Sequence, residues 1–301
     1  MNRVLTIGNN IVDTVLNTRC LPIDGKAFVD AKRVHAGGQG ANAAAGMALL
    51  GLTVSYAGRF GGDSAGGFAA EALRRVGVDL SPSVTVADAD TDTAAVIVNT
   101  ATAERTILMH RDPRLERDAL PVSEAMIAAI DVLYLDGYHL DAGLPAARMA
   151  SRLGKRIVSD LEVVDEQARE LLPLVTELVA PAAVIRELAG GGDTSEAVAK
   201  VAEHGPRTVI ATQGADGATG VTRGSPVVQV PAHECEVRDT TGAGDAYHAG
   251  YVVATTAGRE LPRAMDYAAR VAAAKCEVPG PRLTPGAVHD LVLAPDVGAR
   301  P

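Results

Sequence analysis

Short apolar segments alternate with helical patterns along most of the chain, and this alternation limits the possible fold more than any other feature. Residues 132–135, 156–159, 177–179 and 208–211 have the pattern of buried strands, and most are followed by a helical pattern. A β-then-α rhythm is typical of a mainly parallel sheet with helices on both faces. We therefore expect an α/β, doubly wound fold, with an antiparallel hairpin near residues 221–230 and helices near 41–50, 64–76, 243–257 and 261–275.

Two pairs of extended segments interrupt this rhythm. Residues 11–16 pair with 27–34 around a turn, and residues 93–99 pair with 105–109. Each pair is an excursion between core elements, so together they predict a small accessory sheet that could close over a site as a lid. The lid segments would be about 11–35 and 92–110. Since no repeat or long linker divides the chain, we expect residues 1–301 to form one domain.

Composition excludes several classes of function. The formal net charge of −9 argues against a nucleic-acid partner, because such a field repels phosphates. No stretch approaches the roughly 20 apolar residues that a membrane span needs, and the N-terminal apolar segment is too short for a signal peptide. A cytoplasmic location is expected. The three cysteines fit neither a zinc site nor a disulfide framework.

The strongest chemical signal is residues 238–245, Arg-Asp-Thr-Thr-Gly-Ala-Gly-Asp, at the start of a predicted helix. Small side chains at Gly242, Ala243 and Gly244 let a ligand approach the backbone. The N–H groups and the dipole at a helix start favour an anion such as a transferring phosphoryl group. Asp245, beside this anion hole, could accept the proton of an attacking hydroxyl. An ordinary capped helix would explain a simpler glycine pattern, but less readily this whole octet.

A second signal is residues 36–44, Ala-Gly-Gly-Gln-Gly-Ala-Asn-Ala-Ala. Its glycines would let a substrate lie against the backbone, and Asn42 offers donors and an acceptor to sugar hydroxyls. The stretch is not a Walker A loop, because no Gly-Lys-Ser/Thr follows. It is also a poor dinucleotide-binding motif, since we expect no strand to lead directly into it. Taken alone, the stretch is explained more simply by a glycine-rich loop before an alanine-rich helix.

Together the two stretches resemble the two signatures of the PfkB/ribokinase-like carbohydrate kinases. Further motifs of the family, at residues 58–66, 77–79 and 212–217, agree in order and spacing. The resemblance therefore runs from about residue 4 to about residue 292. The resemblance implies a doubly wound core with a β-sheet lid. It also implies ATP and Mg²⁺ as cofactors, leaves room for a monovalent cation, and implies transfer to a sugar or nucleoside hydroxyl.

The resemblance also assigns roles to residues. It makes Asp245 the base and Gly242, Ala243 and Gly244 the anion hole. Substrate contacts are expected at Asp13, Gly37, Gly38, Gln39 and Asn42. The lid cations Lys26 and Arg105 and the aromatic Tyr138 are further candidates for substrate contacts, on their own chemistry rather than on the resemblance. Nucleotide contacts are expected at Thr212, Gly214, Gly217 and Lys275. Without the family, a solvated loop carboxylate at Asp13 and a strand-terminal hydroxyl at Thr212 would be the simpler interpretations.

One departure concerns the metal. Many relatives carry an Asn-x-x-Glu stretch associated with the metal–phosphate region, but residues 180–190 here contain neither residue in place. We therefore name no metal ligand and expect Mg²⁺ to be held mainly by ATP phosphates and water, which this ion tolerates. Asp160 and Glu162, after a core strand, are candidate helpers.

The acceptor is less determined. Gln39 replaces the lysine of ribokinases proper, and basic residues gather on the lid segments, including Lys26, Arg33 and Arg105. This cluster suggests an anionic substituent on the sugar, although solvated lid charges would explain it as well. Residues 272–276, followed by Gly280-Pro281-Arg282, resemble the tail of a subgroup that includes sulfofructose and other acidic-sugar kinases, which suggests an acidic or ketose sugar. A nucleoside kinase, with Tyr138 or Phe28 against a base, and a catalytically silent sugar-binding regulator remain alternatives. We expect a homodimer formed through the lid.

Overall fold

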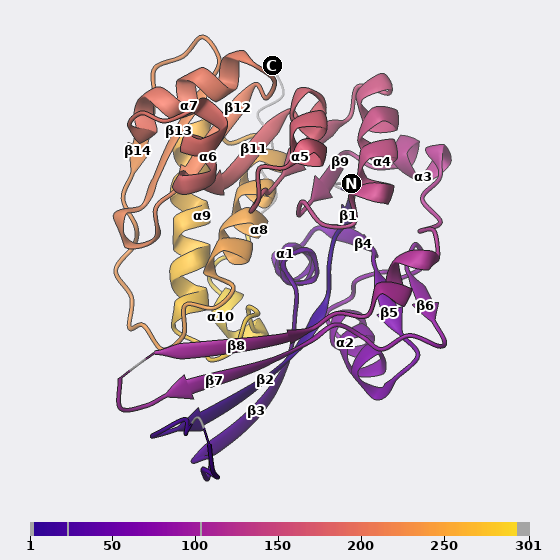
Figure 1. Cartoon of the computed structure of the whole chain (residues 1–301). Coiled ribbons are helices and arrows are strands. Elements are labelled where there is room, and N and C mark those ends of the chain that lie inside the picture. Colours follow the sequence, from indigo (N-terminus) through magenta and orange to yellow (C-terminus); the bar gives the residue numbers. More distant parts are fainter. Residues whose placement is uncertain (1–2, 23, 103, 294–301) are drawn as a thin grey trace.

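The computed structural model describes residues 3–22, 24–102 and 104–293. Its centre is an eight-stranded sheet in the order β14-β13-β12-β11-β10-β9-β1-β4 (Figure 1). The strands are β1 (Arg3–Ile7), β4 (Thr53–Ala57), β9 (Val132–Leu135), β10 (Arg156–Ser159), β11 (Glu177–Pro181), β12 (Thr208–Thr212), β13 (Ala218–Thr222) and β14 (Val228–Val230). The strands from β4 to β12 are parallel, while β13 and β14 are antiparallel. The expected mainly parallel sheet with an antiparallel hairpin is confirmed.

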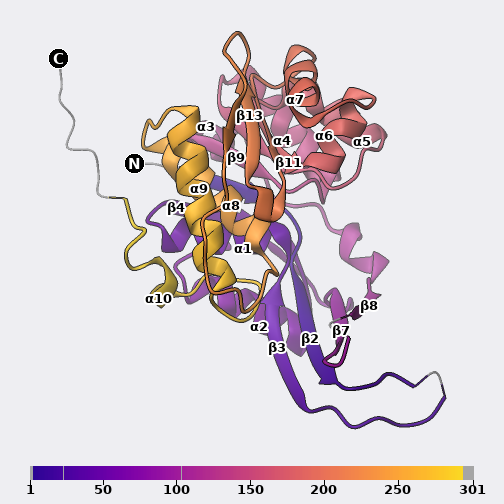
Figure 2. The ribbon, with the colours of Figure 1, turned by 90° about the vertical axis from the view of Figure 1, so that its left-hand side faces the viewer.

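Helices cover both faces of this sheet, because successive side chains of each central strand point to opposite cores. In β9, Val132 and Tyr134 pack into one core, and Leu133 and Leu135 into the other. The first core is closed by α1 (Gln39–Leu49), α2 (Ser64–Arg74), α8 (Ala243–Thr256), α9 (Leu261–Cys276) and α10 (Pro285–Val288). The second is closed by α3 (Glu124–Ala129), α4 (Leu140–Arg152), α5 (Glu166–Leu171), α6 (Ala182–Ala189) and α7 (Thr194–Glu203). Figure 2 shows α8 and α9 on one side of the sheet and α5, α6 and α7 on the other.

The order of the strands also fixes where a ligand can bind. From β1, the chain adds β4 on one side and β9 on the other. In open α/β sheets, ligands bind outside the carboxyl ends of the strands at such a switch point. The segments that follow β1 and β9 are therefore the first place to look for a site. Among the described residues, no helix is both long and apolar enough to cross a bilayer.

A second, four-stranded sheet projects from the body (Figure 1). It has the order β3-β2-β7-β8, with bounds β2 (Ile11–Thr18), β3 (Ala31–Gly37), β7 (Thr93–Asn99) and β8 (Arg105–His110). The two excursions thus join into one small sheet, which confirms the accessory sheet expected from the sequence. A shorter parallel pair, β5 (Arg59–Gly61) with β6 (Val84–Val86), was not predicted, because three-residue strands carry almost no sequence period.

The expectation that no strand leads directly into the first glycine-rich stretch is wrong. Strand β3 runs to Gly37 and α1 begins at Gln39, so Gly38 alone joins the lid to the helix. Gly38 has a φ of 94°, and a Cβ there would lie 2.5 Å from the Cα of Asn10. Only glycine tolerates both conditions. The glycine-rich stretch therefore forms no loop. Its glycine at position 38 makes possible a sharp, one-residue turn from β3 into α1.

A buried glycine tests the packing of the first core. A Cβ on Gly250 of α8 would lie 2.9 Å from the Cα of Ala268 and 3.0 Å from the Cβ of Val271, both on α9. Gly250→Ala should therefore lower the free energy of unfolding by about 1–3 kcal/mol, measured by urea denaturation, because overpacking forces the helices apart. The matched control is Gly67→Ala on α2, where nothing lies within 4 Å. It should stabilise by about 0.5–1 kcal/mol through helix propensity; stabilisation by both variants would contradict the close contact.

Candidate active site

Asp245 and Asn42, from the two glycine-rich stretches, meet at the site. Asp245 lies in the first turn of α8 and is 8% exposed. Asn42 lies in the first turn of α1, and its Nδ2 donates a 2.7 Å hydrogen bond to Oδ2 of Asp245. The two stretches stand about two hundred residues apart in the sequence, so the fold alone joins them.

Small side chains on both helices make this meeting possible. All the described side chains of α1 from Gly40 to Gly46, apart from Asn42, are Ala or Gly, and all of them are buried. A Cβ on Gly46 would lie 2.8 Å from the Cβ of Ala249 on α8. The helix backbones therefore approach closely, which brings the short Asn42 side chain within hydrogen-bonding distance of the carboxylate.

The surroundings of Asp245 raise its proton affinity. Burial raises the pKa of Asp245 to about 7, and the carboxylates of Asp160 and Asp136 add to the rise, while the Asn42 hydrogen bond opposes it. Asp136 and Asp160 follow β9 and β10, and burial raises their pKa values to about 7 and about 8. A carboxylate with a pKa near neutrality is well suited to accept a proton from a hydroxyl.

A buried polar cluster continues beneath Asp245. His248, one turn along α8, places Nε2 3.4 Å from Oδ2 of Asp160, and burial lowers the pKa of His248 to about 4. The second oxygen of Asp160, Nδ1 of His248 and the hydroxyl of Tyr134 are buried without a hydrogen-bond partner among the residues that the structure describes. Sequence reasoning proposed Asp160 as a helper in metal binding; the structure turns one of its oxygens toward this histidine.

The predicted anion hole lies at the start of α8. Gly242 has a φ of 76°, and a Cβ there would collide with the carbonyl oxygen of Pro281. Gly244 differs, because nothing lies within 4 Å of where its Cβ would be. The absence of a side chain at Gly244 is thus not required by packing and leaves the first helical N–H groups open to a ligand.

Arg282 is a site residue that sequence reasoning did not assign. Its Nε donates to Oδ1 of Asn42 at 2.9 Å, and Nη2 donates to the carbonyl of Gly37 at 3.3 Å. Burial lowers the pKa of Arg282 to about 10, and the carboxylates of Asp245 and Asp13 oppose this. Both ends of the Asn42 amide are therefore engaged within the protein, by Arg282 and by Asp245. The only sequence signal for Arg282 was the short stretch Gly280-Pro281-Arg282, which has no helical or strand periodicity from which its contacts could be predicted.

The lid residues divide by the face of the small sheet. In the register, His35 and Ala94 lie opposite Asp13, so their side chains share its face; Arg33 and Arg105 follow on the same face through alternate pairs. Burial raises the pKa of Asp13, and the nearby charge of Arg282, which contacts Asn42, opposes the rise. Lys26 and Phe28 lie in the segment between β2 and β3, and Phe28 is 97% exposed. Gln39, at the start of α1, has a buried Oε1 without a partner in the described chain.

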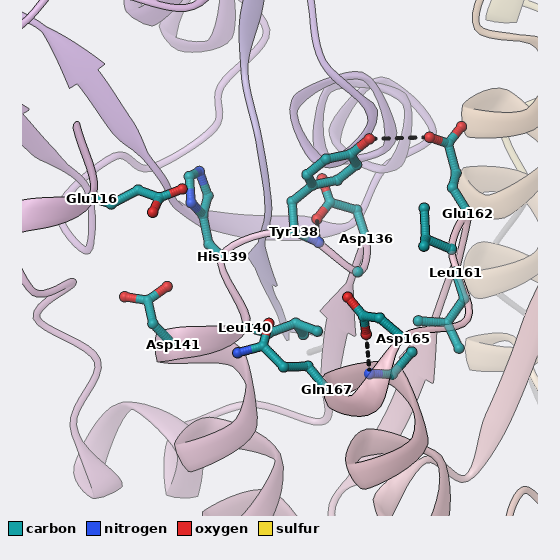
Figure 3. A pocket seen from close by; sticks show the side chains of 13 residues that line it. Glu116, Asp136, Tyr138, His139, Leu140, Asp141, Leu161, Glu162, Asp165 and Gln167 are labelled. Atoms are coloured by element: carbon teal, nitrogen blue, oxygen red, sulfur yellow. Dashed lines mark hydrogen bonds between the residues drawn. The ribbon is translucent and has the colours of Figure 1, made fainter. Parts of the chain in front are cut away.

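A cavity of about 360 Å³ opens at the carboxyl ends of β9 and β10 (Figure 3). Its lining includes Asp136, Tyr138 and Glu162, and the Tyr138 hydroxyl donates to Glu162 at 3.1 Å. Asp136 accepts hydrogen bonds from the backbone N–H groups of Asn9 and Gly40, so this wall adjoins the first turn of α1. Tyr138, predicted to contact the substrate, therefore belongs to a cavity beside the Asp245–Asn42 pair.

The residues predicted to contact the nucleotide lie at the β12–β13 turn and in the last turn of α9. Thr212 ends β12, and Gly214 and Gly217 form the turn to β13. An open hollow of about 760 Å³ borders this turn, with Gln213, Asp216 and Thr219 in its lining. Lys275 lies in the last turn of α9 and is fully buried. In the described part of the chain, no three His, Cys, Asp or Glu side chains gather in a way that could hold a metal ion.

Comparisons with known proteins agree with this geometry. The chain is 26% identical over 253 residues to the 5-dehydro-2-deoxygluconokinase of Bacillus subtilis, covering 77% of this chain and 78% of the relative. It is 29% identical over 291 residues to the ATP-dependent ribose-1-phosphate kinase of Halopiger xanaduensis, covering 95% and 96%. The structure of Arabidopsis thaliana ribokinase complexed with ribose and ATP superposes with a TM-score of 0.85 at 25% identity, covering 97% and 98%.

The family model of the pfkB family carbohydrate kinases matches residues 1–285, nearly the whole chain. The fold agrees with this match, since the sheet order, the covering helices and the separate small sheet correspond to those of a ribokinase. The chain therefore belongs to the pfkB family of carbohydrate kinases and is an ATP-dependent sugar phosphotransferase.

Proposed function

We propose that this kinase transfers the terminal phosphoryl group of ATP to a hydroxyl of an anionic sugar, with Asp245 as the base. The observation that carries the proposal is the position of Asp245. It is a buried carboxylate with a pKa raised to about 7, in the first turn of a helix whose Gly244 faces open space. A base and a row of N–H donors thus lie side by side, as in-line transfer to a hydroxyl requires.

Each part of the site then has a role. The N–H groups at Gly242, Ala243 and Gly244 would receive the phosphoryl oxygens as charge builds on them. Asp13 and the backbone around Gly38 would hold the other acceptor hydroxyls. Asn42, held by Arg282, would orient the Asp245 carboxylate rather than bind the sugar directly. Thr212, Gly214 and Gly217 would border the nucleotide.

Mg²⁺ fits this site as an ion carried with the nucleotide. The described residues offer no protein cage for it, and Mg²⁺ is commonly held by phosphates and water with one or two carboxylates. When bound, the ion would neutralise charge on the phosphates. Glu162, exposed after β10 and lining the cavity, is the carboxylate that we propose to assist it, with one oxygen already accepting from Tyr138.

Asp245→Asn tests the proposed base. The amide keeps the shape and the contact with Asn42 but cannot accept a proton, so kcat should fall on the order of 10²-fold or more. ATP binding, measured by isothermal titration, should change little. In the wild type, kcat/KM should rise with pH and level off above about 7, because the base must be ionised and the pKa of Asp245 is about 7.

The control is Asp266→Asn, an exposed carboxylate on the neighbouring helix α9, which should leave kcat and the pH profile unchanged. If Asp245→Asn retained more than about a tenth of the wild-type kcat, Asp245 would not be the base.

Two observations support an anionic acceptor. Arg33 and Arg105 lie on the same lid face as Asp13. The names of two relatives, 5-dehydro-2-deoxygluconokinase and ribose-1-phosphate kinase, refer to sugars that bear a carboxylate or a phosphate. A carboxylate or phosphate on the sugar would form charge-assisted hydrogen bonds with these guanidinium groups once the lid closes.

Arg105→Ala and Arg33→Ala test this preference. Loss of one charge-assisted hydrogen bond costs about 1.5–3 kcal/mol, so kcat/KM for an anionic sugar should fall about ten- to a hundredfold. A neutral analogue should be barely affected. The matched control is Lys32→Ala, because Lys32 lies on the opposite face of β3 next to Arg33. Equal losses on charged and neutral acceptors would show that the arginines only support the lid, and would favour a neutral hexose or a nucleoside.

We also propose that two copies pair through the lid. The face opposite Asp13 leaves Val34 and Leu108 46% and 59% exposed, an apolar area that a monomer would present to water. Leu108→Glu should therefore shift a dimer to a monomer in multi-angle light scattering at micromolar concentration. Val163→Glu, equally exposed but on the body, should not. A fully active wild-type monomer at that concentration would overturn the proposal.

A further inference from the structure

Lys275 is the only lysine that the described part of the chain buries completely. It lies in the last turn of α9, where a cation is also favoured by the helix dipole. Burial lowers the pKa of Lys275, and the Asp239 carboxylate opposes this by favouring the charged form. A buried ammonium is costly unless it is compensated, so its partners indicate why the chain keeps it.

The partners of this ammonium are backbone carbonyl oxygens. Nζ of Lys275 donates to the carbonyl of Asp239 at 3.0 Å and to the carbonyl of Val278 at 3.2 Å. An ammonium offers three protons, and here two neutral carbonyl oxygens accept from it, the kind of oxygen that also binds K⁺ or NH₄⁺, with one carboxylate nearby; we call these two carbonyls the carbonyl cage. No carboxylate in the described residues forms an ion pair with it within 4.0 Å.

The carbonyl cage lies directly behind the anion hole. Asp239 accepts hydrogen bonds from the N–H of Thr241 at 2.9 Å and from the N–H of Gly280 at 2.8 Å. Its own N–H donates to the carbonyl of Cys276. Three residues after Asp239, Gly242 packs against Pro281 and α8 begins. The ammonium therefore ties the segment that shapes the anion hole to the loop that follows α9.

We infer that Lys275 is a built-in monovalent cation, whose ammonium fills a carbonyl cage behind the anion hole and makes the kinase independent of added K⁺ or NH₄⁺. The inference rests on the proposed phosphoryl transfer at the start of α8. The donor set does not fit a second, free cation at this place, because the lysine already uses the carbonyls of Asp239 and Val278. The fixed charge would hold residues 239–242 in place and add positive potential where phosphoryl charge develops.

The test compares three proteins in a buffer whose only monovalent cation is tetramethylammonium, which is too large for the cage. Wild-type ADP release should change less than about twofold when 100 mM KCl or NH₄Cl is added. Lys275→Ala leaves the carbonyls without their cation and creates room for an ion. Its kcat/KM and its melting temperature should fall in tetramethylammonium. NH₄⁺ or K⁺ should raise kcat/KM again by about tenfold or more, and raise the melting temperature with increasing concentration. Lys275→Met fills the same space with an apolar chain. Its kcat/KM and melting temperature should therefore fall, and neither K⁺ nor NH₄⁺ should restore them.

The matched control is Lys155→Ala. Lys155 also donates to a backbone carbonyl, that of Ala128, but at the surface and away from the site. It should show no dependence on the cation. Either of two results would overturn the inference: Lys275→Ala showing no response to K⁺ or NH₄⁺ in melting temperature, or the wild type activated more than about threefold by K⁺. The melting measurement needs no acceptor. It therefore separates this inference from the proposed function, which fails if no sugar raises wild-type ADP release above the rate with ATP alone.

Discussion

The close contact of α1 with α8 is the constraint on which the site depends. Gly46 packs against Ala249, and the alanines of α1 leave no bulk between the two helices. Only at this separation can the side chain of Asn42 reach Asp245. Both helix starts then face the same end of the sheet, at the switch point beside β1. The packing of glycine and alanine side chains between α1 and α8 therefore sets the distance between Asn42 and the Asp245 carboxylate.

The site concentrates buried carboxylates opposite a few buried cations. Asp245, Asp160 and Asp136 are all buried; Asp160 and Asp136 raise the pKa of Asp245, and Asp160 also raises the pKa of Asp136. Against them stand Arg282, held between Asn42 and Gly37, and the ammonium of Lys275. Carboxylates that cannot all be ionised together provide a group ready to take a proton near neutral pH. The same crowding costs stability, which is typical of functional sites.

Much of this could be predicted from the sequence, for physical reasons. The doubly wound sheet follows from strand and helix periods, and the place of Asp245 follows from a local octet at a helix start. Arg282 and the ammonium of Lys275 could not be placed, because their partners lie far away in the sequence or are backbone oxygens with no sequence signal. The junction at Gly38 was predicted wrongly for a related reason. The sequence alone does not show whether a glycine lies in a loop or forms a one-residue connection between a strand and a helix. Tertiary contacts, not local propensity, decide such cases.

The single-residue connection at Gly38 gives the lid the mechanics of a lever. Only Gly38 separates β3 from α1, and only three residues separate β1 from β2; each of these two lid strands extends about 25 Å at about 3.3 Å per residue. A rotation of about 10° at the base would move the tip by about 4 Å on that length. A sugar that shifts the backbone around Gly38 by a fraction of an ångström would therefore move the far end of the two strands, near Thr18 and Ala31. Recognition at the base and closure at the tip would then be one motion rather than two.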